Sequence, residues 1–218
     1  MSAPLTDVDV RVLGSLIEKE QTTPEYYPLS LNALVTACNQ TSNRDPIVKY
    51  DEGTVSRSID ALRQRGLIRA TKGIDARVTK YAHRVDDVMG LNAGELAVLC
   101  VLMLRGIQTP GELRTRTGRI ETFGDLSEVE AVLDALIVRE LVVRLPRQPG
   151  QKEMRYAHLL TGEVPVDAPI AAQAPARQTS SASTNADRLA TLETTVEELK
   201  KELAELRAQV VAFRAQFE

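Results

Sequence analysis

The sequence predicts a mainly α-helical protein with small β-hairpins (α+β), in which one unit of three helices and a hairpin occurs twice and a single helix follows. Two observations support this prediction. A segment that begins near residue 55 recurs 74 residues later with similar residue types. Residues 188–218 place apolar side chains at alternating steps of three and four, which is the spacing of a coiled coil.

The first helix of each unit is predicted over residues 6–20 and 92–104. Thr6 is followed by Asp9, and Asn92 by Glu95, which are residue types that form a capping box. Gly106 is a typical residue at the end of a helix. The second helix of each unit is predicted over residues 30–39 and 110–117.

The third helix and the strand after it carry the repeat, because their apolar positions recur at helical spacing in both units. The matched pairs are Val55/Val129, Ile59/Leu133, Asp60/Asp134, Ala61/Ala135, Leu62/Leu136, Arg65/Arg139, Leu67/Leu141 and Ile68/Val142. Residues 69–79 and 144–154 are polar and basic and contain Gly or Pro, so each predicts a hairpin with an irregular tip. Three helices followed by a two-stranded ribbon define the winged-helix arrangement.

These patterns predict a first winged-helix domain over residues 1–88, a second over 89–160, a flexible linker over 161–187 and a coiled-coil helix over 188–218. The apolar seam of the last helix favours a homodimer. A helix folded back on the globular part, an antiparallel pair and a higher oligomer remain as alternatives. The seam, predicted as a protein interface, consists of Leu189, Leu192, Val196, Leu199, Leu203, Leu206, Val210, Phe213 and Phe217.

The charge of the chain is uneven. The 218 residues carry a formal net charge of −3, which argues against a wholly basic coat for nucleic acid. Residues 44–84 nevertheless hold ten Lys and Arg against five Asp and Glu. Arg and Gln side chains read base edges, and Lys and Arg bind phosphates. The candidate DNA-binding residues are Asn43, Arg44, Ser56, Arg57, Arg63, Gln64, Arg69, Lys72, Arg77 and Lys80.

Asn43 and Arg44 lie in a polar stretch over residues 39–46 that has two interpretations. In one, they contact phosphate or base. In the other, they cap the second helix and organise the loop. The first unit is longer than the second because of residues 21–29 and 40–49, and long loops inside a compact domain are either disordered or used.

The third helix of the second unit presents a different face. Helical projection turns small apolar side chains outward among acidic residues, so this face would repel DNA and suits a protein contact. The candidate interface consists of Ala131, Asp134, Ala135 and Val138.

No catalytic constellation, metal-ligand spacing or phosphate loop is present in the sequence, so we expect no enzyme activity, no cofactor and no metal. Cys38 and Cys100 lie in apolar helical patterns and are expected to be buried. His83 and His158 fall at equivalent strand positions, which the repeat explains. The chain opens without a signal-like segment and lacks an apolar run of membrane-spanning length, so a cytoplasmic protein without a membrane partner is expected.

The segment YPLSLNALVTACNQ over residues 27–40, followed by Ser42-Asn43-Arg44-Asp45-Pro46, resembles the hallmark of the YceH-like family of bacterial proteins. The sequence LIEKE over residues 16–20 and the two Tyr-Ala-His endings fit it too. The resemblance covers about residues 5–160 and implies two tandem winged-helix domains. It supplies no catalytic or ligand residues. Thr41 stands where a Lys is expected in that family.

These features predict a non-catalytic tandem winged-helix protein that binds double-stranded DNA as a dimer through its first domain, in keeping with a transcriptional regulator. The alternative is a module for protein–protein interaction, similar to the winged-helix subunits of chromosome-condensation complexes. The basic stretch over residues 44–84 favours DNA. The overall acidity and the face around Val138 favour a protein partner.

Overall fold

The computed structural model describes residues 4–72, 78–147 and 153–162. They belong to one compact unit, which extends to Ala168. The part of the predicted linker beyond residue 162 and the predicted coiled-coil helix lie outside the described residues, as does Arg77.

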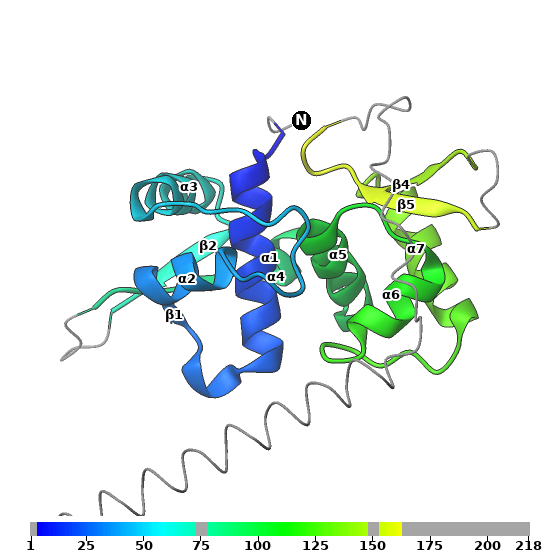
Figure 1. The fold of residues 1–218 in the computed structure, drawn as a ribbon, viewed down its shortest axis with the longest axis horizontal. Coiled ribbons are helices and arrows are strands. Elements are labelled where there is room, and N and C mark those ends of the chain that lie inside the picture. The colour runs from blue at the N-terminus through cyan, green and yellow to red at the C-terminus, as the bar shows by residue number, and fades with distance from the viewer. Residues whose placement is uncertain (1–3, 73–77, 148–152, 163–218) are drawn as a thin grey trace, which may run out of the picture. The chain divides into compact units, whose positions relative to one another are not determined.

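The described residues form seven α-helices and two small antiparallel sheets, so the mainly helical α+β class is confirmed (Figure 1). The first half contains α1 (Asp7–Thr22), the 3-10 helix η1 (Pro24–Tyr26), β1 (Leu29–Ser30), α2 (Leu31–Cys38), α3 (Glu52–Gln64), β2 (Ile68–Thr71) and β3 (Lys80–His83). A short helix, α4 (Val85–Met89), leads to the second half. That half contains α5 (Ala93–Arg105), α6 (Pro110–Thr117), α7 (Leu126–Val138), β4 (Val142–Leu145) and β5 (Arg155–His158).

Strand pairing follows the same order in both halves. In the first, β3 lies between β1 and β2, and Leu29 pairs with Tyr81. In the second, β4 pairs with β5, and an isolated bridge joins Gln108 to Tyr156. Gln108 precedes α6 much as β1 precedes α2. The repeat seen in the sequence is therefore a repeat of three helices, a short strand segment and a hairpin.

The helix starts are fixed by side chains, as the sequence predicts. The Thr6 hydroxyl accepts from the amide of Asp9, at 3.2 Å, and the Asp9 carboxylate accepts from the amide of Thr6, at 3.0 Å. Asn92 and Glu95 form the same reciprocal pair on α5, at 2.9 and 3.0 Å. A third capping box, between Thr109 and Glu112, starts α6. Each box satisfies amide groups that the first turn of a helix leaves unpaired.

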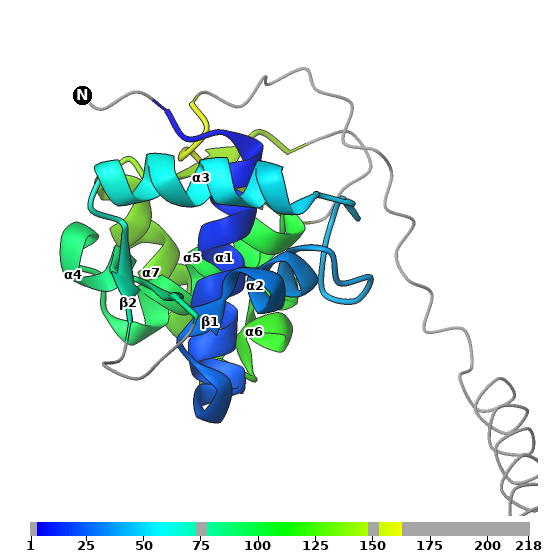
Figure 2. The same cartoon turned by 90° about the vertical axis from the view of Figure 1, so that its left-hand side faces the viewer.

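The core is centred on two helices, one from each half, that pack against each other (Figures 1 and 2). Every residue from Asp9 to Glu18 in α1 and from Glu95 to Leu104 in α5 is buried. Gly14 permits the close approach, since a Cβ at this position would lie 2.9 Å from Leu104 Cδ2. One continuous apolar cluster therefore runs through both halves.

Candidate nucleic-acid interface

Helix α3 presents a polar face to solvent. It begins at Asp51, whose carboxylate accepts from the amide of Thr54 at 2.6 Å, and it buries Val55, Ile59 and Leu62 against α1 and α2. The 3.6-residue period then leaves the opposite face exposed. That exposed face carries Arg57, Asp60, Ala61, Arg63 and Gln64, with Ser56 partly buried at its edge.

The exposed cations of α3 are only lightly engaged. Arg57 donates to the Thr54 hydroxyl at 3.1 Å, and Arg63 approaches Asp60 at 3.4 Å. Both contacts lie at the surface, where such pairs contribute little to stability. Both guanidinium groups therefore remain accessible to a ligand.

The hairpin formed by β2 and β3 adds three exposed cations beside α3. Arg69 pairs with Ala82 across the ladder, and Lys80 pairs with Thr71. Lys72 follows directly after β2, and all three cations are exposed. α3 and β2 are connected by a tight turn and contact each other. The first half thus presents an exposed, predominantly basic hairpin next to an exposed helix face.

The two candidate residues in the polar loop over residues 39–46 differ in exposure to solvent. Asn43 is exposed and adopts a left-handed backbone with φ of 58°, a conformation that Asn tolerates. The Arg44 side chain is fully buried, with 0% of its surface exposed. An Arg in this position cannot reach a phosphate of DNA, so the placement of Arg44 among the DNA-contacting residues is corrected. The structure supports its other interpretation, in which it organises the loop.

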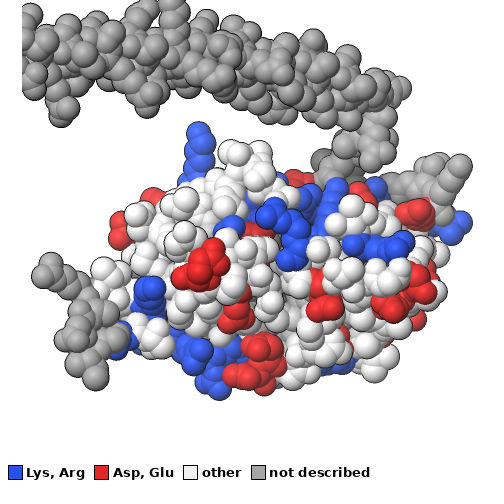
Figure 3. Space-filling view, turned by 90° about the horizontal axis from the view of Figure 1, so that it is seen from below, with Lys and Arg blue, Asp and Glu red and all other residues white. Residues whose placement is uncertain are grey.

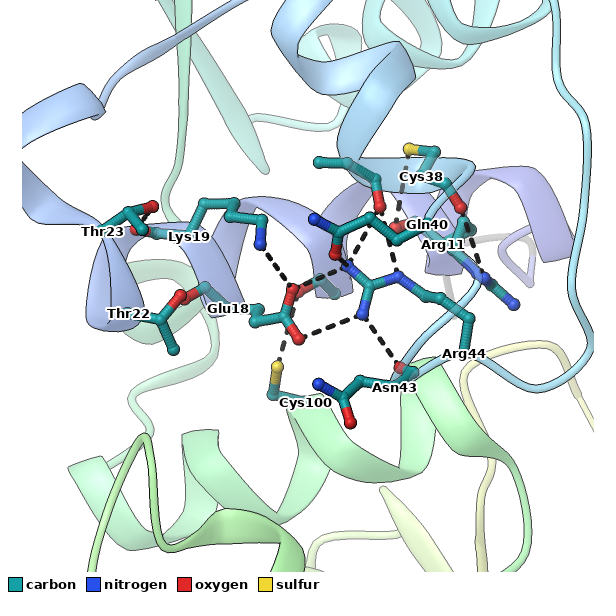
Figure 4. Close-up of polar contacts among 12 residues, drawn as sticks. Arg11, Glu18, Lys19, Thr22, Thr23, Cys38, Gln40, Asn43, Arg44 and Cys100 are labelled. Atoms are coloured by element: carbon teal, nitrogen blue, oxygen red, sulfur yellow. Dashed lines mark hydrogen bonds and ion pairs between the residues drawn. The ribbon is translucent and has the colours of Figure 1, made fainter. Parts of the chain in front are cut away.

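Arg44 binds atoms from three segments of the first half (Figure 4). Its two terminal nitrogens donate to the carboxylate of Glu18 on α1, at 2.6 and 3.0 Å. Its Nε donates to the carbonyl of Ala37 on α2, at 3.2 Å, and it also reaches Gln40 Oε1 at 3.1 Å. Burial by itself raises the pKa of Glu18, but the hydrogen bond and charge of Arg44 outweigh it and hold that pKa below its ordinary value.

The same loop joins the two halves. The amide of Asp45 donates to the carbonyl of Leu104 at the end of α5, at 2.9 Å. Arg11 on α1 donates to the carbonyl of Pro46 at 2.6 Å. Arg105 on α5 donates to the side-chain oxygen of Asn43. The polar loop over residues 39–46 is therefore held by contacts to both α1 and α5.

Helix α7 presents the face predicted as a protein interface. Ala131, Asp134, Ala135 and Val138 are all exposed, and Val138 is 84% exposed. Asp134 forms an ion pair with Arg144 of β4 at 2.8 Å. Ala131 and Ile137 of α7 occupy the positions that correspond to Arg57 and Arg63 of α3. This helix therefore has no cation at either position.

The two cysteines lie in helices and the two histidines lie in strands. Cys38 and Cys100 are buried, as expected, and burial raises the pKa of both thiols. His83 lies beside Glu20, with Nε2 2.6 Å from the carboxylate. His83 and His158 pair with Ile68 and Val142, which are equivalent positions of the repeat. In the part of the chain described here, no cluster of His, Cys, Asp or Glu could hold a metal ion.

Comparison with known proteins places the chain in a family. Residues 5–151 match the family described as "Protein of unknown function, DUF480", so the chain belongs to that family, and the YceH-like resemblance of its central motif is confirmed.

Its relatives carry the name UPF0502 protein. The one from Opitutus terrae is 56% identical over 165 residues, which cover 74% of this chain and 72% of the relative. The one from Pelobacter propionicus is 50% identical over 224 residues and covers 100% of both chains. UPF0502 protein VVA1225 from Vibrio vulnificus is 48% identical over 217 residues, covering 96% of this chain and 98% of the relative.

No helix among residues 4–72, 78–147 and 153–162 combines the length and apolar character needed to cross a membrane.

Proposed function

We propose that this chain is a non-catalytic tandem winged-helix protein that binds double-stranded DNA through α3 and the β2–β3 hairpin of its first half. The order of elements in each half supports the winged-helix assignment. In that class the third helix enters the major groove and the hairpin lies along phosphates. Self-association through residues 188–218 would present two such surfaces to one duplex.

The observation that carries the proposal is a difference between two copies of one scaffold. Arg57, Arg63 and Gln64 are exposed on α3, whereas Ala131, Ile137 and Val138 occupy the equivalent positions on α7. Arg and Gln are side chains that read base edges with two hydrogen bonds. The exposed cations of the β2–β3 hairpin extend this surface toward phosphates. Of the two helices, α3 therefore presents Arg and Gln side chains on its exposed face, and α7 contains neither.

The test is a salt titration of binding to a mixed-sequence duplex, followed by fluorescence anisotropy. Each phosphate contact contributes about 0.9 to the slope of log affinity against log salt concentration. Replacing Arg57→Ala together with Lys72→Ala removes two cations, so this slope should become shallower by about 1–2 and the affinity should fall.

The matched control is Arg114→Ala together with Arg147→Ala, which removes two exposed cations from the second half. This control should leave both slope and affinity unchanged. An equal loss in both double variants, or no binding to the duplex at low salt, contradicts the proposal.

A second candidate function rests on the exposed face of α7. Val138 is almost fully exposed on a helix that packs Val129, Leu133 and Leu136 into the core. Exposed apolar surface bordered by acidic residues suits a protein partner better than DNA. Indifference to DNA at low salt, combined with a protein captured by a photocrosslinker at Val138 and not by one at Gln64, would favour this candidate.

A further inference from the structure

A pocket of about 390 Å³ opens between the two halves of the described unit. Its walls come from the end of α1, the loop after α2, the end of α5 and the region around the end of α6. Figures 1 and 2 place α3 and α6 on different sides of this unit, so the pocket is separate from the surface proposed for DNA.

The charge of the pocket is strongly positive. Lys19, Arg105, Arg116 and Arg119 line it, against the single carboxylate of Glu18. That carboxylate is shared by the buried guanidinium of Arg44, at 2.6 Å, and by Lys19, at 3.3 Å, so the cations of this region still outnumber it. Figure 3 shows Lys and Arg side chains gathered near the centre of the face seen from below.

Two of the lining cations, Arg105 and Arg116, are oriented by neutral amide groups. Arg105 donates to the amide oxygen of Asn43, and Arg116 donates to the amide oxygen of Gln108. An amide orients a guanidinium without neutralising it. Arg116 also lies 3.4 Å from Glu112, and Arg119 has no hydrogen bond or ion pair to another described residue.

The crowding of like charges favours an anion. Burial, followed by the neighbouring charge of Arg116, lowers the pKa of Arg105. Partial burial is the main cause of this shift, and the nearby guanidinium of Arg116 adds to it. A bound anion would remove this repulsion and would form charge-assisted hydrogen bonds with the planar donors.

The pocket also has an apolar side. Val101, Leu104 and Ile120 contribute to its lining. Its volume falls in the range of small-molecule sites, which combine apolar walls with a few convergent polar groups. A ligand with one charged end and one organic end fits this combination.

We propose that the pocket binds a small organic phosphate of about nucleotide size, with its phosphate group between Lys19, Arg105 and Arg119 and its organic part against Val101 and Ile120. The ligand would contact both halves at once. This binding does not depend on the proposed DNA function, because no residue of α3 or of the first hairpin lines the pocket.

The test is isothermal titration calorimetry of the full chain with ADP as the probe, alongside inorganic pyrophosphate, adenosine and citrate. ADP should bind saturably, pyrophosphate more weakly and adenosine not at all. Lys19→Gln together with Arg119→Gln should reduce the affinity for ADP by about tenfold or more, because two charge-assisted contacts are lost. Circular dichroism of this variant should match that of the unaltered chain, since Arg119 is exposed and Glu18 keeps Arg44 as its partner when Lys19 is replaced.

Arg114→Gln is the matched control, because it removes one exposed cation of α6 that does not line the pocket. It should leave ADP binding unchanged. The proposal is overturned if neither ADP nor pyrophosphate binds saturably, or if Arg114→Gln weakens binding as much as the pocket variant does. It is also overturned if citrate binds as tightly as ADP, or if duplex DNA displaces ADP.

Discussion

At the scale of single residues, the guanidinium of Arg44 connects α1, α2 and the loop over residues 39–46. It binds Glu18 on α1, the carbonyl of Ala37 on α2 and the carbonyl of its neighbour Asn43. A planar group with five N–H donors can satisfy all of these acceptors together. The buried carboxylate of Glu18 therefore depends on Arg44 for its compensation.

Replacing Arg44 should destabilise the fold. Arg44→Ala leaves the Glu18 carboxylate buried without its main partner, so the free energy of unfolding should fall by about 3 kcal/mol. Arg44→Lys keeps the charge but loses the two-pronged contact, so its loss should be smaller. Urea unfolding followed by circular dichroism measures both.

The control for Arg44 is Arg63→Ala, which breaks only the exposed pair with Asp60. Exposed pairs contribute about 0–1 kcal/mol, so this variant should unfold close to the unaltered chain. Equal losses for Arg44→Ala and Arg63→Ala would show that the buried pair does not stabilise the loop.

At the scale of elements, the contact between α1 and α5 depends on a residue without a side chain. A Cβ at Gly14 would meet Leu104 Cγ at 3.0 Å and Met103 Cβ at 3.2 Å, in addition to Leu104 Cδ2. These groups are buried and packed on their other sides. The two helices can approach this closely only with Gly at this position.

Adding a side chain at Gly14 should therefore separate the helices. Gly14→Ala gains up to about 1 kcal/mol of helix propensity. Overpacking of a tight core costs about 1–3 kcal/mol and outweighs that gain. We expect a net loss of about 1 kcal/mol for Gly14→Ala and a larger loss for Gly14→Val, measured by urea unfolding. Gly111→Ala on α6 is the control, since its Cβ would meet only Glu153 Oε2 at 4.0 Å. A stabilised Gly14→Ala variant would contradict the tight contact.

The sequence predicts most individual elements because their signals are local. Capping pairs mark the starts of α1 and α5, and helical spacing gives the buried positions Val55, Ile59 and Leu62 of α3. The short elements η1 and α4 escape prediction because one turn of helix carries no periodicity.

The burial of α1 on all sides is not predictable from its sequence. Asp9, Arg11 and Glu18 are of residue types that are usually exposed, yet all three are buried. Each is compensated by a distant partner: Asp9 by Ser58 at 2.6 Å, Arg11 by the carbonyl of Pro46, and Glu18 by Arg44. Local patterns do not reveal pairings over such separations. The basic pocket has a partial signal, because Arg114, Arg116 and Arg119 are clustered in the sequence, but the contribution of Lys19 requires the fold.

At the scale of the whole molecule, the described residues form a unit with its own core, and the predicted coiled-coil helix lies outside them. Stability of that core and self-association should therefore be separable properties. The apolar seam from Leu189 to Phe217 is the feature that predicts association.

Removing residues 186–218 should lower the mass measured by light scattering to that of a single chain. The thermal unfolding of the remaining chain should persist as a cooperative transition, because none of its described contacts is removed. If the measured mass still corresponds to the same number of chains, the surface of association lies outside residues 186–218. Loss of the unfolding transition would show that the last helix completes the core.

The pairing of α1 with α5 has an evolutionary consequence. Each of the two repeated halves supplies a wall of the other's interior. A change on one side of the contact between α1 and α5 must be matched on the other, as Gly14 is matched to Leu104. The two copies can therefore diverge freely only on their outer surfaces, and recombination should transfer them together.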